Sequence, residues 1–98
     1  MARYERNFQK DLMDEIRAMF PGCVIQKMDA NYLQGFPDWL ILYKDRWAVL
    51  EAKISEEADW QPNQEDYVAR LNYMSFSRFV YPENKDEVLE ALYRHFMY

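Results

Sequence analysis

The sequence predicts an α/β domain in which a mixed four-stranded sheet is flanked by helices. Residues 38–43 and 46–54 are apolar on both faces, which is typical of central strands, and only Lys44 and Asp45 separate them. Stripes of apolar side chains at helical spacing precede and follow this pair. We therefore expect residues 1–98 to form a single domain with the element order αβββαβα.

The first helix is expected over residues 4–20, where apolar side chains fall on one stripe: Phe8, Leu12, Ile16, Met19 and Phe20. Pro21 and Gly22 end this helix because both residues are strong breakers. Residues 23–28 are expected to form the first strand, and residues 29–35 a loop. The strands at 38–43 and 46–54 then form a hairpin around Lys44 and Asp45, although this pair lacks the glycine that favours the tightest turns.

The second half of the chain predicts two more helices and one strand. Pro62 suits the first turn of a helix, and its inner stripe follows: Gln64, Tyr67, Val68, Leu71 and Met74. Residues 76–81 are expected to be a short strand. Asn84, with Glu87 three residues later, is typical of a helix start. The apolar face of that last helix consists of Val88, Leu89, Leu92, Tyr93 and Phe96.

Composition restricts the function. The chain has 12 basic and 17 acidic residues and a net charge of −5, which argues against indiscriminate nucleic-acid binding unless the cations gather on one face. No apolar run approaches the ~20 residues of a membrane span. The N-terminus lacks a secretory signal, so we expect a cytoplasmic protein. The single cysteine, Cys23, excludes an internal disulfide and a multi-cysteine zinc site. The single histidine, His95, argues against a His-based zinc site or a Ser-His triad, so any metal would have oxygen ligands.

Three charged residues stand at the ends of the two apolar strands. If Lys44 and Asp45 form a two-residue turn, Asp38 lies directly opposite Glu51, and Lys53 is one step further along the same face. Two carboxylates facing each other between apolar faces are unfavourable unless a cation lies between them or one is protonated. The register therefore predicts a metal site held by oxygen ligands, which favours Mg²⁺ or Mn²⁺.

Two polar residues on the helices are expected to face the same place. Glu5 lies on the apolar stripe of the first helix near its N-terminus, and Gln64 opens the stripe of the next helix. Each residue also has an ordinary explanation. Acids favour helix N-termini and Gln64 could simply begin its helix, while Asp38 could be a turn residue and Glu51 and Lys53 a solvated strand end. The joint placement of Asp38, Glu51 and Lys53 favours a site.

Metal-assisted phosphodiester hydrolysis is the chemistry that uses such a set. Carboxylates hold the metal ions that polarise a phosphoryl oxygen and acidify water, and a lysine orients that water or stabilises transition-state charge. We predict that Asp38, Glu51 and Glu5 bind the metal. Asp38, Glu51, Lys53 and Gln64 are the predicted catalytic residues, with Gln64 supporting the site.

At these residues the chain resembles the PD-(D/E)xK nuclease superfamily. Pro37-Asp38 followed by Glu51-Ala52-Lys53 across a hairpin matches its motif. The wider pattern is similar to the small stand-alone VRR-NUC proteins and, more distantly, to archaeal-type Holliday junction resolvases. Those families carry a helical glutamate, a basic residue on the first strand, a Gly-x-Pro-Asp turn and a glutamine opening the next helix. The corresponding residues are Glu5, Lys27, Gly35 to Asp38, and Gln64.

The resemblance implies a restriction-endonuclease-like fold and a Mg²⁺- or Mn²⁺-dependent DNA endonuclease. It further implies a viral or phage-encoded protein in a bacterial or phage-infected host cell, branched or four-way junction DNA as a candidate substrate, 5′-phosphate products and a homodimer. We expect no organic cofactor. Lys27 could instead be a surface lysine, and Trp60, in the acidic loop, could contact DNA or a partner. The alternative is a non-catalytic interaction module on the same fold, which the acidity and the aromatic content would suit.

Overall fold

The computed structural model describes residues 3–59 and 61–98, so Trp60 lies outside the described residues. Its secondary structure is α1 Arg3–Met19, β1 Val24–Lys27, β2 Trp39–Tyr43, β3 Arg46–Ala52, α2 Gln64–Met74, β4 Ser77–Val80, a 3₁₀ turn Pro82–Asn84 and α3 Lys85–Met97. The αβββαβα order is thus confirmed. In the described part of the chain, no helix is long and apolar enough to cross a membrane.

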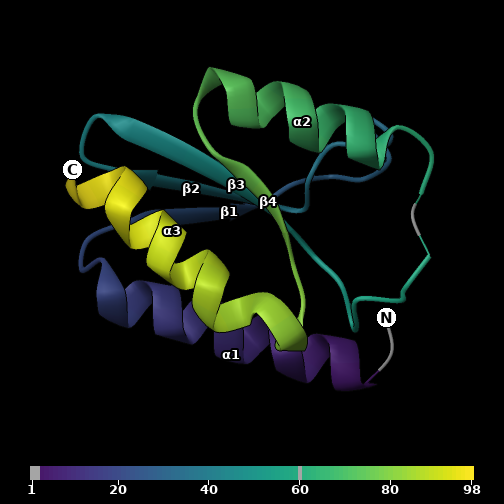
Figure 1. Ribbon diagram of the computed structural model, residues 1–98, viewed down its shortest axis with the longest axis horizontal. Helices are drawn as coiled ribbons and strands as arrows, with labels where there is room; N and C mark the ends of the chain where they lie inside the picture. Colours follow the sequence, from purple (N-terminus) through teal and green to yellow (C-terminus); the bar gives the residue numbers. More distant parts are fainter. Residues whose placement is uncertain (1–2, 60) are drawn as a thin grey trace.

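The sheet is mixed, with strand order β1-β2-β3-β4. The first three strands are antiparallel, whereas β3 and β4 run parallel because α2 carries the chain back between them. Figure 1 shows α1 and α3 together on one side of the sheet and α2 on the other. The protein is therefore a three-layer α/β/α sandwich.

The predicted hairpin register is confirmed. Tyr43 pairs with Arg46, and the pairing continues to Trp39 opposite Leu50, which brings Asp38 and Glu51 to neighbouring positions at the strand ends. Lys44 adopts a left-handed backbone conformation, with φ of 56°, so the turn forms without a glycine.

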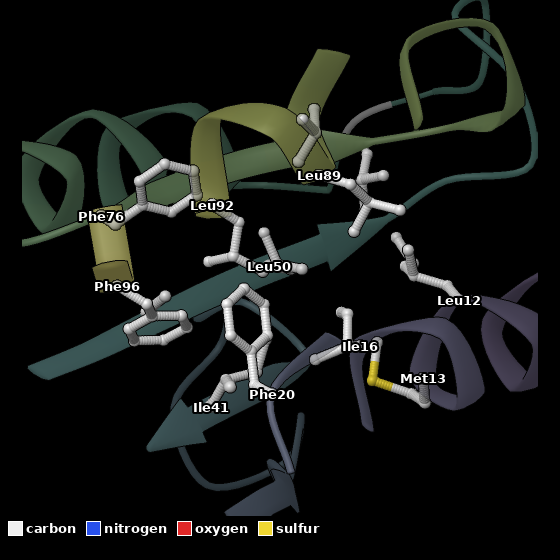
Figure 2. Close-up of a cluster of buried hydrophobic side chains, with 14 residues drawn as sticks. Leu12, Met13, Ile16, Phe20, Ile41, Leu50, Phe76, Leu89, Leu92 and Phe96 are labelled. Atoms are coloured by element: carbon white, nitrogen blue, oxygen red, sulfur yellow. The ribbon is translucent and has the colours of Figure 1, made fainter. Parts of the chain in front are cut away.

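The main core lies between the sheet and the α1/α3 layer. Figure 2 shows Ile16 of α1, and Phe20 just after this helix, packed with Leu50 of β3 and with Leu92 and Phe96 of α3. Because side chains alternate along a strand, Glu51, the neighbour of Leu50, lies on the opposite face, towards α2. The core therefore fixes the orientation of the candidate site.

Three expectations need correction. Both central strands were expected to be buried on both faces, and β3 is buried in this way. Leu42 of β2, in contrast, is 42 % exposed, because α2 packs against β4 and leaves the β1–β2 half of that face open. Pro62 precedes α2, which begins at Gln64. The side chain of Asn84 makes no capping bond to α3; it turns back, accepting from the Tyr81 amide and donating to the Phe79 carbonyl.

Candidate active site

Asp38 is presented by a loop that is anchored to the N-terminal end of α2. Gly35 has φ of 89°, and a Cβ at this position would lie 2.6 Å from the Pro62 carbonyl oxygen. The neighbouring Phe36 packs edge-on against Tyr67 of α2, with ring centroids 5.7 Å apart. The Gly-x-Pro-Asp turn therefore needs its glycine because the backbone of another segment lies directly against it.

The two carboxylates meet where the hairpin opens. The Asp38 amide donates a hydrogen bond of 3.2 Å to Oε1 of Glu51, and the Asp38 carbonyl accepts one of 2.7 Å from the Met28 amide. Glu51 is 3 % exposed, so its carboxyl is almost completely removed from water. Burial raises the pKa of Glu51 to about 8, and the negative charge of Asp38 adds to the effect, while the Lys53 ammonium opposes it.

The ammonium group of Lys53 lies close to three oxygen acceptors. Its amide donates to the Val80 carbonyl of β4 over 2.8 Å, so the backbone remains paired just beyond β3. Its Nζ lies 2.7 Å from Oε1 of Gln64, 3.3 Å from the Asp59 carbonyl oxygen and 3.9 Å from Oε2 of Glu51. These contacts hold the ammonium beside the carboxylates in one orientation.

Gln64 is buried at the start of α2, and its side chain holds Lys53 in place. Its Oε1 accepts hydrogen bonds both from Lys53 Nζ and from the Gln61 amide, the latter over 2.9 Å. The Asp59 and Gln61 contacts were not predicted, because they use main-chain atoms and the side-chain pattern carries no signal for them.

Lys27 also reaches the site. Its Nζ lies 3.5 Å from Oδ2 of Asp38 and 4.6 Å from the centre of the Trp39 ring. Lys27 is an exposed residue, and this ion pair joins the end of β1 to the candidate site.

Glu5 lies in the first turn of α1. The described residues contain no group of three or more His, Cys, Asp or Glu side chains already close enough to hold a metal. The assignment of Glu5 as a third ligand therefore stays a prediction.

His95 is partly buried. Its Nε2 lies 3.0 Å from the Trp47 carbonyl oxygen and 3.2 Å from Ser75 Oγ, where it links α3 to β3.

The donor set suits a hard divalent cation. Asp38 and Glu51 offer only oxygen ligands. Burial, and after it the negative charge of Asp38, raises the pKa of Glu51, and a bound cation would favour the ionised carboxylate again. Mg²⁺ is commonly bound by one or two carboxylates together with waters and substrate phosphate, so a pair of carboxylates is sufficient. The residues present therefore fit Mg²⁺ or Mn²⁺.

Comparison with solved structures gives the same fold. The chain is similar to a VRR_NUC domain, with a TM-score of 0.72 and 23 % identity over 91 % of this chain and 97 % of that one. It is also similar to Hjc, a Holliday junction resolvase from Archaeoglobus fulgidus, with a TM-score of 0.53 and 13 % identity over 78 % of this chain and 67 % of that one. No family model and no curated protein matches the sequence. The expected restriction-endonuclease-like fold is thus confirmed.

Proposed function

We propose that this protein is a metal-dependent DNA endonuclease that hydrolyses phosphodiester bonds. The observation that carries the proposal is the convergence of Asp38, Glu51 and Lys53 at the open end of one hairpin, with Gln64 clamping the lysine from α2. The fold shared with a VRR_NUC domain and a Holliday junction resolvase supports the same class of activity. The fold alone does not carry the conclusion, because one fold hosts many functions.

Each residue has a role that follows from its surroundings. Asp38 and Glu51 would hold the divalent ion, which when bound supplies a Lewis acid for the phosphoryl oxygen and a more acidic water. Lys53, already fixed by three oxygen acceptors, would exchange one of them for the attacking water or a phosphate oxygen and stabilise the charge that develops there. Gln64 keeps that ammonium aimed at the carboxylates.

The test is cleavage of labelled DNA by the purified full chain. Supercoiled plasmid, linear duplex and a four-way junction are each incubated with Mg²⁺, Mn²⁺ or EDTA. We expect cleavage with either metal, none with EDTA, and products that a ligase can rejoin because they carry 5′ phosphates. Asp38→Asn should lose at least about 100-fold in rate, whereas Asp45→Asn, which removes an exposed aspartate from the hairpin turn, should cleave like wild type.

The outcomes separate the alternatives. A wild-type protein that cuts none of these substrates with either metal contradicts the proposal. Salt-sensitive DNA affinity without nicking would indicate a DNA-binding protein, and metal binding without DNA affinity would favour the interaction module.

The proposal extends to junction DNA and to a homodimer, because symmetric cutting of two strands requires two sites related by a two-fold axis. Light scattering is then expected to give about twice the chain mass of 12.0 kDa. Faster cutting of plain duplex than of the junction would contradict the junction preference alone.

A further inference from the structure

A basic cavity lies beside the candidate active site, between α1 and the β1–β2 edge of the sheet. It has a volume of about 410 Å³. Among the described residues that line it, none is acidic and four are cationic: Arg6, Lys10, Arg17 and Lys27. A third of the 12 basic residues of this acidic chain thus gather around one cavity.

Two buried donors in the same cavity have no partner. Gln9 is 3 % exposed, and within the described residues its Nε2 forms no hydrogen bond; the same is true of the buried indole Nε1 of Trp39. A buried polar group without a partner costs about 1–3 kcal/mol, so native proteins rarely leave one unpaired. Both donor atoms are shielded from solvent, but the residues that carry them line the basic cavity. A small movement of these side chains would let both donate to a bound group rich in acceptor oxygens.

The cations are only partly neutralised by the protein itself. Asp14 is shared, because it lies 2.8 Å from Lys10 Nζ and 3.6 Å from an Arg17 nitrogen. Arg6 forms no ion pair within residues 3–59 and 61–98. Asp11 also acts on Lys10. Four positive side chains are therefore set against three carboxylates, Asp11, Asp14 and Asp38, which leaves an excess of positive charge.

Lys27 links the cavity to the candidate site, because it lines the cavity and its Nζ lies 3.5 Å from Oδ2 of Asp38. The cations of α1 extend away from that point along one helix face. From Arg6 to Arg17 the helix rises about 16 Å, which is enough for several consecutive phosphates at about 3.4 Å of rise per nucleotide in each strand of B-DNA.

We propose that this cavity binds the sugar-phosphate backbone of the DNA strand adjoining the scissile bond, with Arg6, Lys10 and Arg17 pairing with phosphates and Gln9 and Trp39 donating hydrogen bonds to them. The inference rests on the proposed function and adds where the substrate lies. It also explains how a chain with net charge −5 binds a polyanion, since phosphate contacts depend on local rather than net charge.

Fluorescence anisotropy of labelled duplex and junction DNA tests the cavity directly, in EDTA so that no cleavage intervenes. The double variant Arg6→Gln/Arg17→Gln should bind at least 10-fold more weakly than wild type. Its slope of log affinity against log salt should be shallower by about 1.8, because two phosphate contacts are lost. The matched control, Arg70→Gln/Arg94→Gln, removes two exposed arginines from α2 and α3 and should bind within twofold of wild type.

Gln9 provides a second test that a purely structural role would not pass. Gln9→Leu removes the unpaired amide, so the midpoint of thermal unfolding should stay the same or rise. DNA affinity should nevertheless fall about threefold or more. Gln9→Glu should reduce DNA affinity further because it adds a charge that repels phosphate.

The results also separate this inference from the proposed function. Wild-type affinity and salt slope in both the Arg6/Arg17 and the Gln9 variants would overturn the cavity assignment, even if the protein cleaves DNA. Loss of affinity in those variants, together with a wild type that never cleaves, would support the cavity and reject the nuclease. A wild type that binds no DNA at low salt would overturn both.

Discussion

The Glu51→Gln variant is expected to become progressively more stable than wild type as the pH rises from 5 to 9. In the folded protein the pKa of Glu51 is raised from 4.5 to about 8, chiefly by burial and then by Asp38. The folded state therefore keeps a proton that the unfolded chain releases above about pH 4.5. Wild-type stability is lost as the pH rises through this window and levels off above about pH 8.

The magnitude follows from the same shift. At about 1.4 kcal/mol per pKa unit, it corresponds to a loss on the order of 5 kcal/mol at high pH, most of it present by pH 8. Glutamine at position 51 keeps the shape of the side chain and the acceptor for the Asp38 amide, but it cannot ionise. Ionisation at this position therefore cannot lower the stability of the variant as the pH rises. The difference between the two proteins should be small at pH 5 and several kcal/mol at pH 9.

Urea denaturation at pH 5, 6, 7, 8 and 9, without metal, measures this difference. Glu90→Gln, which removes an exposed carboxylate from α3, controls for the loss of one negative charge. A difference between wild type and Glu51→Gln that stays constant from pH 5 to 9 would refute the argument from burial.

The same proteins test the metal ligand. Mg²⁺ requires the ionised carboxylate, so its binding to wild type should release a proton and tighten as the pH rises towards 8. Bound metal should then stabilise wild type in proportion to its occupancy. Equal stabilisation of Glu51→Gln by Mg²⁺ would show that Glu51 is not a ligand.

Three further variants test the surroundings of the site. Lys53→Gln should reduce the cleavage rate about 100- to 1,000-fold in the plasmid assay, whereas Lys85→Gln, which breaks an ion pair with Glu15, should cleave like wild type. Gln64→Leu removes a hydrogen-bond acceptor of Lys53 and should lower the free energy of unfolding by about 1–3 kcal/mol. Its cleavage rate should fall less than that of Lys53→Gln. An equal fall in cleavage rate would show that Gln64 takes part in the chemistry itself. Gly35 and Gly22 both have a φ of 89°, but only at Gly35 would an added Cβ meet other atoms. In urea denaturation, Gly35→Ala should therefore lose clearly more free energy of unfolding than Gly22→Ala. Equal losses would contradict the close packing at Gly35.

Much of the fold follows from local patterns in the sequence. The period of the apolar residues determines whether each segment is a helix or a strand. The two-residue turn at Lys44 and Asp45 fixes the register of the hairpin, and with it the neighbouring positions of Asp38 and Glu51. Lys53 follows from the alternation of side chains along one strand.

The packing between distant segments could not be predicted as well from the sequence. Helical phase places Glu5 on the inner side of α1, yet it cannot say which face of the sheet α1 covers. In the same way, the apolar run of β2 does not reveal that α2 leaves Leu42 partly exposed. Both depend on which face each helix covers, and that is decided by contacts between distant segments.

The elements, the hairpin register and the carboxylate pair with its lysine can all be predicted from the sequence, because each depends on residues close together in the chain. Their surroundings depend on packing between distant segments. That packing buries Glu51 and raises its pKa, and it places Gln64 against Lys53. It also gathers cations of α1 and β1 around Gln9, a charge arrangement that net composition conceals because composition carries no information on position.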